Sequence, residues 1–87
     1  MKKITMFMIE SCPYCQAARR WMDELKENNP DFKDLEIEMI DENVHPEIAN
    51  QYDYHYVPTY YIEDEKVHEG AANLRKVNKV LKAALKA

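Results

Sequence analysis

The chain has 87 residues, of which 46% are hydrophobic, and a formal net charge of -4 at pH 7. This length suits a single domain over residues 1–87, with no room for a second core. The mostly acidic surface disfavours nucleic acid as a partner, and no apolar stretch reaches the length of a membrane span. The two cysteines are too few for a disulfide-stapled secreted scaffold. We therefore expect a cytoplasmic monomer.

The first two elements flank a pair of cysteines. The apolar run Ile4–Ile9 predicts a buried strand. After Cys15, hydrophobic residues recur in steps of three and four, which is typical of an amphipathic helix. This pattern places the cysteines on a strand-to-helix turn, with Cys12 near the N-cap and Cys15 one turn inside. The apolar positions expected on the buried helix face are Tyr14, Ala17, Ala18, Trp21, Met22 and Leu25.

The sequence Cys12-Pro13-Tyr14-Cys15 predicts a dithiol that cycles between reduced and oxidised forms. Free N–H groups and the positive end of the helix dipole favour a thiolate at this position. In such motifs a cysteine pKa falls from about 8.5 to roughly 3.5–7.5. Pro13 suits the first helical position, because its missing N–H is no loss there.

Other interpretations of the cysteine pair lie outside redox chemistry. A zinc site would need further ligands, but there is no second cysteine pair, and His45, His55 and His68 lack a recognisable ligand spacing. A structural disulfide would close a very short loop and would constrain little of the unfolded chain. Two unrelated buried thiols would leave the proline in the motif unexplained.

The remaining elements follow in order along the chain. The alternation in Leu35–Ile40 predicts a strand with one buried face, and Pro46 opens a short helix. Val57–Ile62 predicts a third strand, and Lys66–Glu69 a short fourth strand at an edge. Gly70 then precedes a last helix. Its inner face is expected to carry Leu74, Val77, Leu81, Ala84 and Leu85.

The expected order of elements is therefore βαβαββα. Strands joined through a helix are parallel, and the last two strands form an antiparallel hairpin. This order predicts an α/β fold with a four-stranded mixed β-sheet and flanking helices. Five of the six tyrosines gather in its second half and are expected to pack on strands and helix with their hydroxyls reaching water; they are Tyr52, Tyr54, Tyr56, Tyr60 and Tyr61.

The chain resembles the thioredoxin-fold superfamily, and specifically its small glutaredoxin-like and thioredoxin-like redoxins. Cys12-Pro13-Tyr14-Cys15 is typical of dithiol glutaredoxins, Val57-Pro58-Thr59 resembles the cis-proline segment, and Gly70 falls where both groups carry a glycine. The resemblance spans essentially the whole chain. It implies the thioredoxin fold and an enzyme of the thiol-disulfide oxidoreductase type.

The resemblance also implies roles for individual residues. Cys12 would be the nucleophile and Cys15 the resolving thiol, so the redox-active group would be the Cys12–Cys15 disulfide, with no bound cofactor and no metal. Val57-Pro58 would be a cis peptide whose backbone pairs with an extended substrate. Expected substrate-binding residues are Tyr56, Val57, Pro58, Thr59 and Gly70, with Tyr14 and Tyr56 either on the rim of a groove or simply packed.

Departures from the glutaredoxin pattern bear on the electron donor. Ile9 stands where glutathione-binding members usually have a lysine, and Tyr56 stands where they have a threonine. These differences favour a thioredoxin-like carrier that reduces protein disulfides and is recycled by a flavoprotein disulfide reductase. The alternatives are a glutathione-dependent glutaredoxin, an iron–sulfur or metal-binding module with Cys12 as a ligand, and a non-catalytic adaptor.

Overall fold

The computed structural model describes residues 1–86 and confirms the expected order of elements. In that part of the chain, no helix is long and apolar enough to cross a membrane. A short 3₁₀ helix, η1, follows the first α-helix and is the one element that the sequence did not predict. The elements are β1 (Ile4–Met8), α1 (Pro13–Asn28), η1 (Pro30–Phe32), β2 (Ile37–Asp41), α2 (Pro46–Ala49), β3 (Thr59–Ile62), β4 (Glu65–Glu69) and α3 (Leu74–Lys86).

The four strands form one mixed sheet in the order β2-β1-β3-β4. Strand β1 runs parallel to β2, with Ile4 opposite Ile37, and antiparallel to β3, with Met6 opposite Tyr60. Strand β4 pairs antiparallel with β3 and lies at the edge. The predicted four-stranded mixed sheet with an edge hairpin is therefore confirmed.

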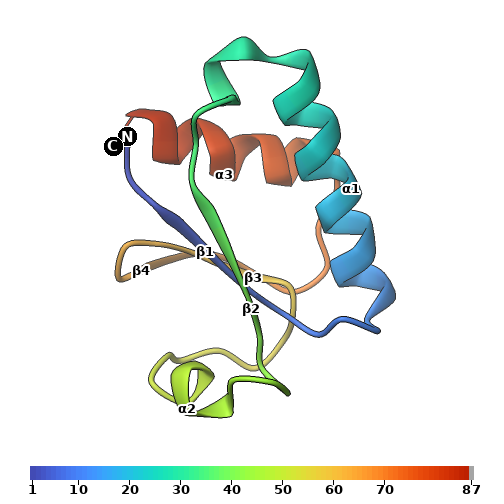
Figure 1. Ribbon diagram of the computed structural model, residues 1–87, viewed down its shortest axis with the longest axis vertical. Coiled ribbons are helices and arrows are strands. Elements are labelled where there is room, and N and C mark those ends of the chain that lie inside the picture. Colours follow the sequence, from blue (N-terminus) through green and yellow to red (C-terminus); the bar gives the residue numbers. More distant parts are fainter. Residues whose placement is uncertain (87) are drawn as a thin grey trace.

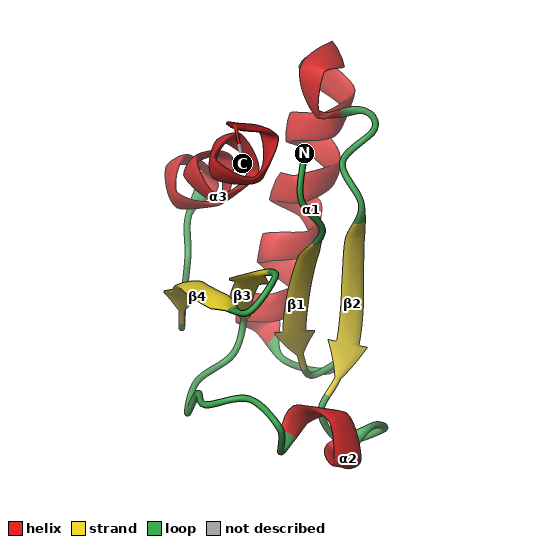
Figure 2. Ribbon diagram, turned by 90° about the vertical axis from the view of Figure 1, so that its left-hand side faces the viewer, coloured by secondary structure: helices red, strands yellow, loops and turns green. Residues whose placement is uncertain are grey.

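Helices cover both faces of the sheet. Helices α1 and α3 lie together on one side, and α2 lies on the other (Figures 1 and 2). The larger core cluster, between the sheet and the α1/α3 layer, includes Met6, Cys15, Tyr60 and Leu81. A smaller cluster on the α2 side is built around Phe7. Because β1 is buried on both faces, its sequence is apolar almost throughout rather than alternating.

The predicted burial pattern is wrong in part on strand β2 and on helix α3. Met39 of the edge strand β2 is 47% exposed, whereas Ile40 is buried on the opposite face, against the Phe7 cluster. Strand β2 therefore contributes to both faces of the sheet and has no single buried face. On α3, Leu74 at the first turn is 40% exposed, and Val80 is a buried position that the prediction missed.

Four of the five clustered tyrosines pack as expected, whereas Tyr56 is exposed, and the hydroxyls of the packed ones do not all reach water. The ring centroids of Tyr52, Tyr54 and Tyr61 lie 4.7, 5.0 and 5.9 Å from that of Phe7. The hydroxyls of Tyr54 and Tyr61 donate to protein oxygens at 2.9 and 2.7 Å. The Tyr60 side chain is fully buried, and its hydroxyl has no hydrogen-bond partner within residues 1–86.

Candidate functional site

Cys12 occupies the predicted position at the start of α1. It is the N-cap residue in an extended conformation, and Pro13 follows it in the first helical turn. The Cys12 N–H donates to the Ile9 carbonyl at 3.0 Å, and its own carbonyl accepts the Gln16 N–H at 2.9 Å. These two bonds fix the turn between β1 and α1. The Cys12 side chain is half-buried, so its thiol remains within reach of an approaching molecule.

The environment of Cys12 favours the thiolate. Burial by itself would raise the pKa of this thiol, but favourable interactions with the Cys15 N–H, the Cys15 thiol and the Tyr14 N–H outweigh it and lower the pKa below the ordinary value. The N–H groups belong to the first turn of α1, where they have no partner within the helix. The predicted activation of Cys12 by the helix terminus therefore has a structural basis.

Cys15 lies in the opposite environment. Its side chain is fully buried in the core cluster beneath the sheet. The pKa of Cys15 is raised to about 12, chiefly by burial. The neighbouring Cys12 and Glu42 also raise it, and the interaction with the Ile9 backbone lowers it. The two cysteine side chains interact directly, near the distance that a disulfide requires. The site thus pairs an accessible, acidic thiol with a buried, protonated one.

Asp41 orders the loop before the cysteines, and the sequence analysis missed it. Its carboxylate accepts the Glu10 N–H at 3.0 Å and the Asn43 N–H at 2.8 Å. Asp41 ends β2 opposite Met8, which ends the parallel strand β1. Since parallel strands end at the same edge of a sheet, this register is the signal that would have placed Asp41 beside the motif.

The predicted proline segment precedes β3 and packs against the core cluster that contains Cys15. The Val57–Pro58 peptide bond is cis, as expected from the resemblance. Pro58 is fully buried, and its carbonyl accepts the Gly70 N–H at 2.9 Å. Val57 and Cys12 are both partly buried against the core cluster that contains Cys15. Val57 and the two cysteines therefore pack in or against the same core cluster.

The two tyrosines that were expected either at the rim of a groove or simply packed are both exposed. Tyr14 is 61% exposed and Tyr56 is 70% exposed, so Tyr14 does not belong to the buried helix face on which it was expected. Gly70 adopts a φ of +93°, which L side chains rarely adopt, and a Cβ there would lie 3.8 Å from that of Tyr56.

The described part of the chain contains no cluster of side chains that could bind a metal ion. Within residues 1–86, no group of three or more histidine, cysteine, aspartate and glutamate side chains is placed to hold a metal ion. Both cysteines are free thiols that face one another.

A cysteine pair on a strand-to-helix turn, together with a cis-proline segment before β3, defines a thiol-disulfide redox protein of the thioredoxin fold. Comparison with known proteins agrees with this class. The family model described as Glutaredoxin matches residues 4–67. The chain therefore belongs to the glutaredoxin family.

Relatives with the names thioredoxin and thioredoxin-like extend the similarity to nearly the whole chain. A protein called thioredoxin from Methanocaldococcus jannaschii is 31% identical over 83 residues, 95% of each chain. The crystal structure of a thioredoxin-like protein, a point mutant, is 25% identical with a TM-score of 0.64, covering 91% of this chain and 99% of the other. Thioredoxin 1 from Thermosipho africanus is 23% identical with a TM-score of 0.61, covering 94% and 97%, and supports the fold alone.

Proposed function

We propose that this protein is a dithiol protein-disulfide reductase, an electron carrier working as a single domain and a monomer in the cytoplasm. The observation that carries the proposal is the contrast between the two thiols. Cys12 is accessible with a lowered pKa, whereas Cys15 is buried with a raised one. This contrast is what a nucleophile and a resolving thiol require, because only the thiolate attacks a disulfide.

The reaction follows from this division of roles. The Cys12 thiolate attacks one sulfur of the substrate disulfide, which breaks the substrate S–S bond, forms a mixed disulfide and releases a first substrate thiolate that takes up a proton. Cys15 then loses its proton and attacks the Cys12 sulfur. The mixed disulfide breaks, the Cys12–Cys15 disulfide forms, and the second substrate thiol leaves. Two electrons and two protons pass from the dithiol to the substrate.

Proximity supports the second step. The Cys15 thiol already interacts with the Cys12 sulfur in the reduced protein. Attack within one chain avoids the entropic cost of bringing a second molecule to the mixed disulfide.

The substrate is proposed to be a protein disulfide in an extended segment. Val57 and Pro58 would offer their backbone beside the cysteines, as in strand addition, with Thr59 and Gly70 holding that segment. Tyr14 and Tyr56 would contact apolar side chains that flank the substrate cysteine, because both rings are largely exposed. Pro13 would start the helix that presents Cys12.

The electron donor is proposed to be a flavoprotein disulfide reductase of the thioredoxin-reductase type. Membership of the glutaredoxin family favours glutathione instead, whereas the relative from Methanocaldococcus jannaschii is named a thioredoxin. Ile9, at the turn into the motif, offers no charge to a glutathione carboxylate.

Two coupled assays test this choice. The oxidised protein is offered NADPH with thioredoxin reductase, or glutathione with glutathione reductase and NADPH, and the loss of NADPH absorbance is followed. We expect turnover with the first system and little with the second. Turnover with glutathione alone would replace the proposed donor, and no reduction of insulin disulfides with any donor would overturn the proposed function.

A further inference from the structure

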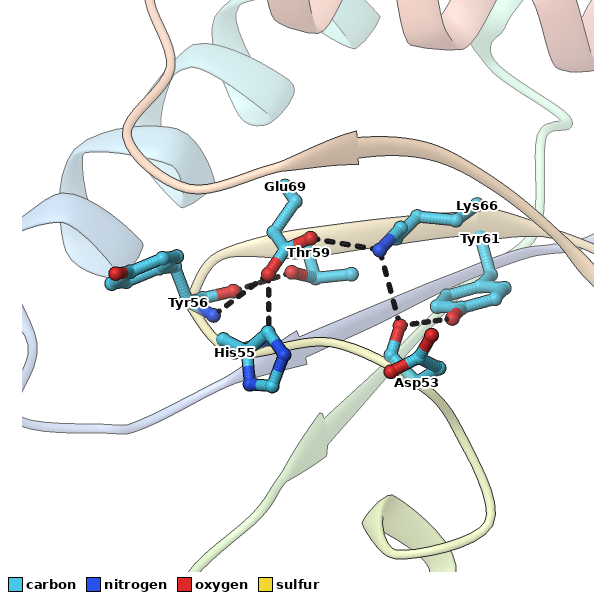
Figure 3. Close-up of polar contacts among 7 residues, drawn as sticks. All are labelled: Asp53, His55, Tyr56, Thr59, Tyr61, Lys66 and Glu69. Carbon is cyan, nitrogen blue, oxygen red and sulfur yellow. Dashed lines mark hydrogen bonds and ion pairs between the residues drawn. The ribbon is translucent and has the colours of Figure 1, made fainter.

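A single carboxylate on the edge strand holds the loop that leads to Pro58. Figure 3 shows Glu69 of β4 pointing towards the loop, with one carboxylate oxygen facing two consecutive backbone N–H groups. Its Oε2 accepts the His55 N–H at 2.6 Å and the Tyr56 N–H at 3.1 Å. These amides belong to an irregular segment between α2 and β3, where no strand partner is available to them.

The second carboxylate oxygen ties the same point to the start of the loop. Lys66 Nζ donates to Glu69 Oε1 at 2.8 Å and to the Asp53 carbonyl at 3.2 Å. The Tyr61 hydroxyl donates to that Asp53 carbonyl at 2.7 Å. Both ends of residues 53–56 are therefore fastened to the β3–β4 hairpin, and Glu69 is the member of the network that contacts the end nearer Pro58 (Figure 3).

The charge of Glu69 is stabilised by its partners. The bond from Lys66 and those from the His55 and Tyr56 N–H groups lower the pKa of this carboxyl to about 2. A charged carboxylate on an edge strand usually faces water, but the Glu69 side chain is only 22% exposed and both of its oxygens are engaged. Hydrogen bonds to a carboxylate are about twice as strong as those between neutral groups.

These contacts leave the residue before the cis peptide little freedom. The Tyr56 N–H is bound by Glu69, and its carbonyl accepts a hydrogen bond from the Thr59 hydroxyl. The Pro58 carbonyl accepts the N–H of Gly70, the residue that follows the end of β4 at Glu69. The Tyr56–Val57 peptide group is thus held by Thr59 of β3, and the Pro58–Thr59 peptide group by the residue that follows edge strand β4.

We propose that Glu69 is a positioning residue for substrate recognition, which holds residues 53–57 so that the Val57 backbone is ready to accept an extended protein substrate. Lys66 holds the carboxylate in place. This inference rests on the proposed function and deepens it. Glu69 does not touch the thiols, so it acts on the binding of protein disulfides and leaves the chemistry of Cys12 unchanged.

The test compares Glu69→Ala with Glu65→Ala, a matched change on the same strand, since the Glu65 carboxylate has no hydrogen-bond or ion-pair partner within residues 1–86. Insulin reduction is followed with dithiothreitol as the reductant, which makes the readout independent of the natural donor. Reaction with bis(2-hydroxyethyl) disulfide and alkylation of Cys12 by iodoacetamide report on the thiol alone.

We expect Glu69→Ala to raise KM for insulin about tenfold, as the loss of one or two well-placed backbone hydrogen bonds would. The kcat of Glu69→Ala with insulin should equal that of Glu65→Ala. The two variants should also react at equal rates with bis(2-hydroxyethyl) disulfide and with iodoacetamide. Glu69→Gln, which keeps an acceptor for the two N–H groups, should fall between wild type and Glu69→Ala. An unchanged KM, or equal losses with insulin and the small disulfide, would overturn the proposal.

Amide hydrogen exchange separates this proposal from the proposed function. We expect faster exchange of the His55 and Tyr56 amides in Glu69→Ala than in Glu65→Ala. If that occurs while wild type fails to reduce insulin, the loop is held as described and the proposed function is wrong. If exchange at these amides is unchanged in Glu69→Ala, the positioning role of Glu69 is wrong whatever the activity.

Discussion

Replacing Tyr60 by phenylalanine should stabilise the protein, because it removes a buried polar group that has no partner. Tyr60 is fully buried in the larger core cluster, and its hydroxyl has no hydrogen-bond partner within residues 1–86. Burial raises the pKa of this hydroxyl, and the charge of a Cys15 thiolate would raise it further, so it stays protonated at neutral pH.

The size of the effect follows from the cost of desolvation. A buried polar group without a partner costs about 1–3 kcal/mol, while phenylalanine keeps the ring and its packing. We therefore expect Tyr60→Phe to raise the free energy of unfolding by about 1 kcal/mol or more. For a domain of this size, each kcal/mol corresponds to a rise in Tm of about 4–8 °C.

Urea denaturation of the reduced proteins measures the difference in free energy of unfolding between wild type and Tyr60→Phe. Tyr61, the next residue of β3, provides the control. The Tyr61 hydroxyl donates to the Asp53 carbonyl at 2.7 Å, so Tyr61→Phe should lose about 0.5–1.5 kcal/mol. The two variants delete the same atom from adjacent positions and should change stability in opposite directions. A Tyr60→Phe protein that loses as much stability as Tyr61→Phe would refute the reasoning.

Three further predictions concern the thiols and the glycine. The rate of Cys12 alkylation by iodoacetamide should reach half its maximum below pH 9.0, since the pKa of Cys12 is lowered; a midpoint at or above that value would contradict the described environment. The pKa of Cys15 is about 12 in the folded protein and about 9 in the unfolded chain, so above pH 9 the unfolded chain loses this proton first. The free energy of unfolding should therefore be unaffected by Cys15 below about pH 9 and should fall as the pH rises towards 12. Denaturation curves of wild type and Cys15→Ser across that range would show it, and an equal pH dependence in both would exclude Cys15 as the cause. Gly70→Ala should lower the free energy of unfolding by about 1–2 kcal/mol, because an alanine is strained at a φ of +93°. The nearest atom to an added Cβ is at an ordinary 3.8 Å, so no steric clash contributes. An unchanged Tm would show that this backbone conformation does not require glycine.

The sequence predicted those features that depend on local pattern. The apolar run of β1, the helical spacing after Cys15 and the proline at the first helical turn were sufficient to place the cysteines at a strand-to-helix turn. The directions of the first two strands and of the last two followed from which connections contain a helix. The cis geometry of Val57–Pro58 came from the resemblance and could not be obtained from the residues alone.

The features that the sequence did not predict depend on which segments the fold brings together. Met39 and Ile40 differ in burial because helices cover both faces of the sheet unequally along β2, and alternation within one strand carries no such information. Asp41 and Glu69 look like surface carboxylates until the loops before Cys12 and Pro58 lie against them. Their partners are backbone N–H groups, which leave no mark in the sequence.

Trapping of a mixed disulfide tests the central claim most directly. The reduced Cys15→Ser and Cys12→Ser proteins are mixed with insulin, quenched with acid and analysed by intact mass. If Cys12 is the nucleophile and Cys15 the resolving thiol, Cys15→Ser will accumulate a covalent complex through Cys12, and Cys12→Ser will form none. A Cys15→Ser protein that turns over insulin at the wild-type rate, or a complex formed only by Cys12→Ser, would contradict the assigned roles.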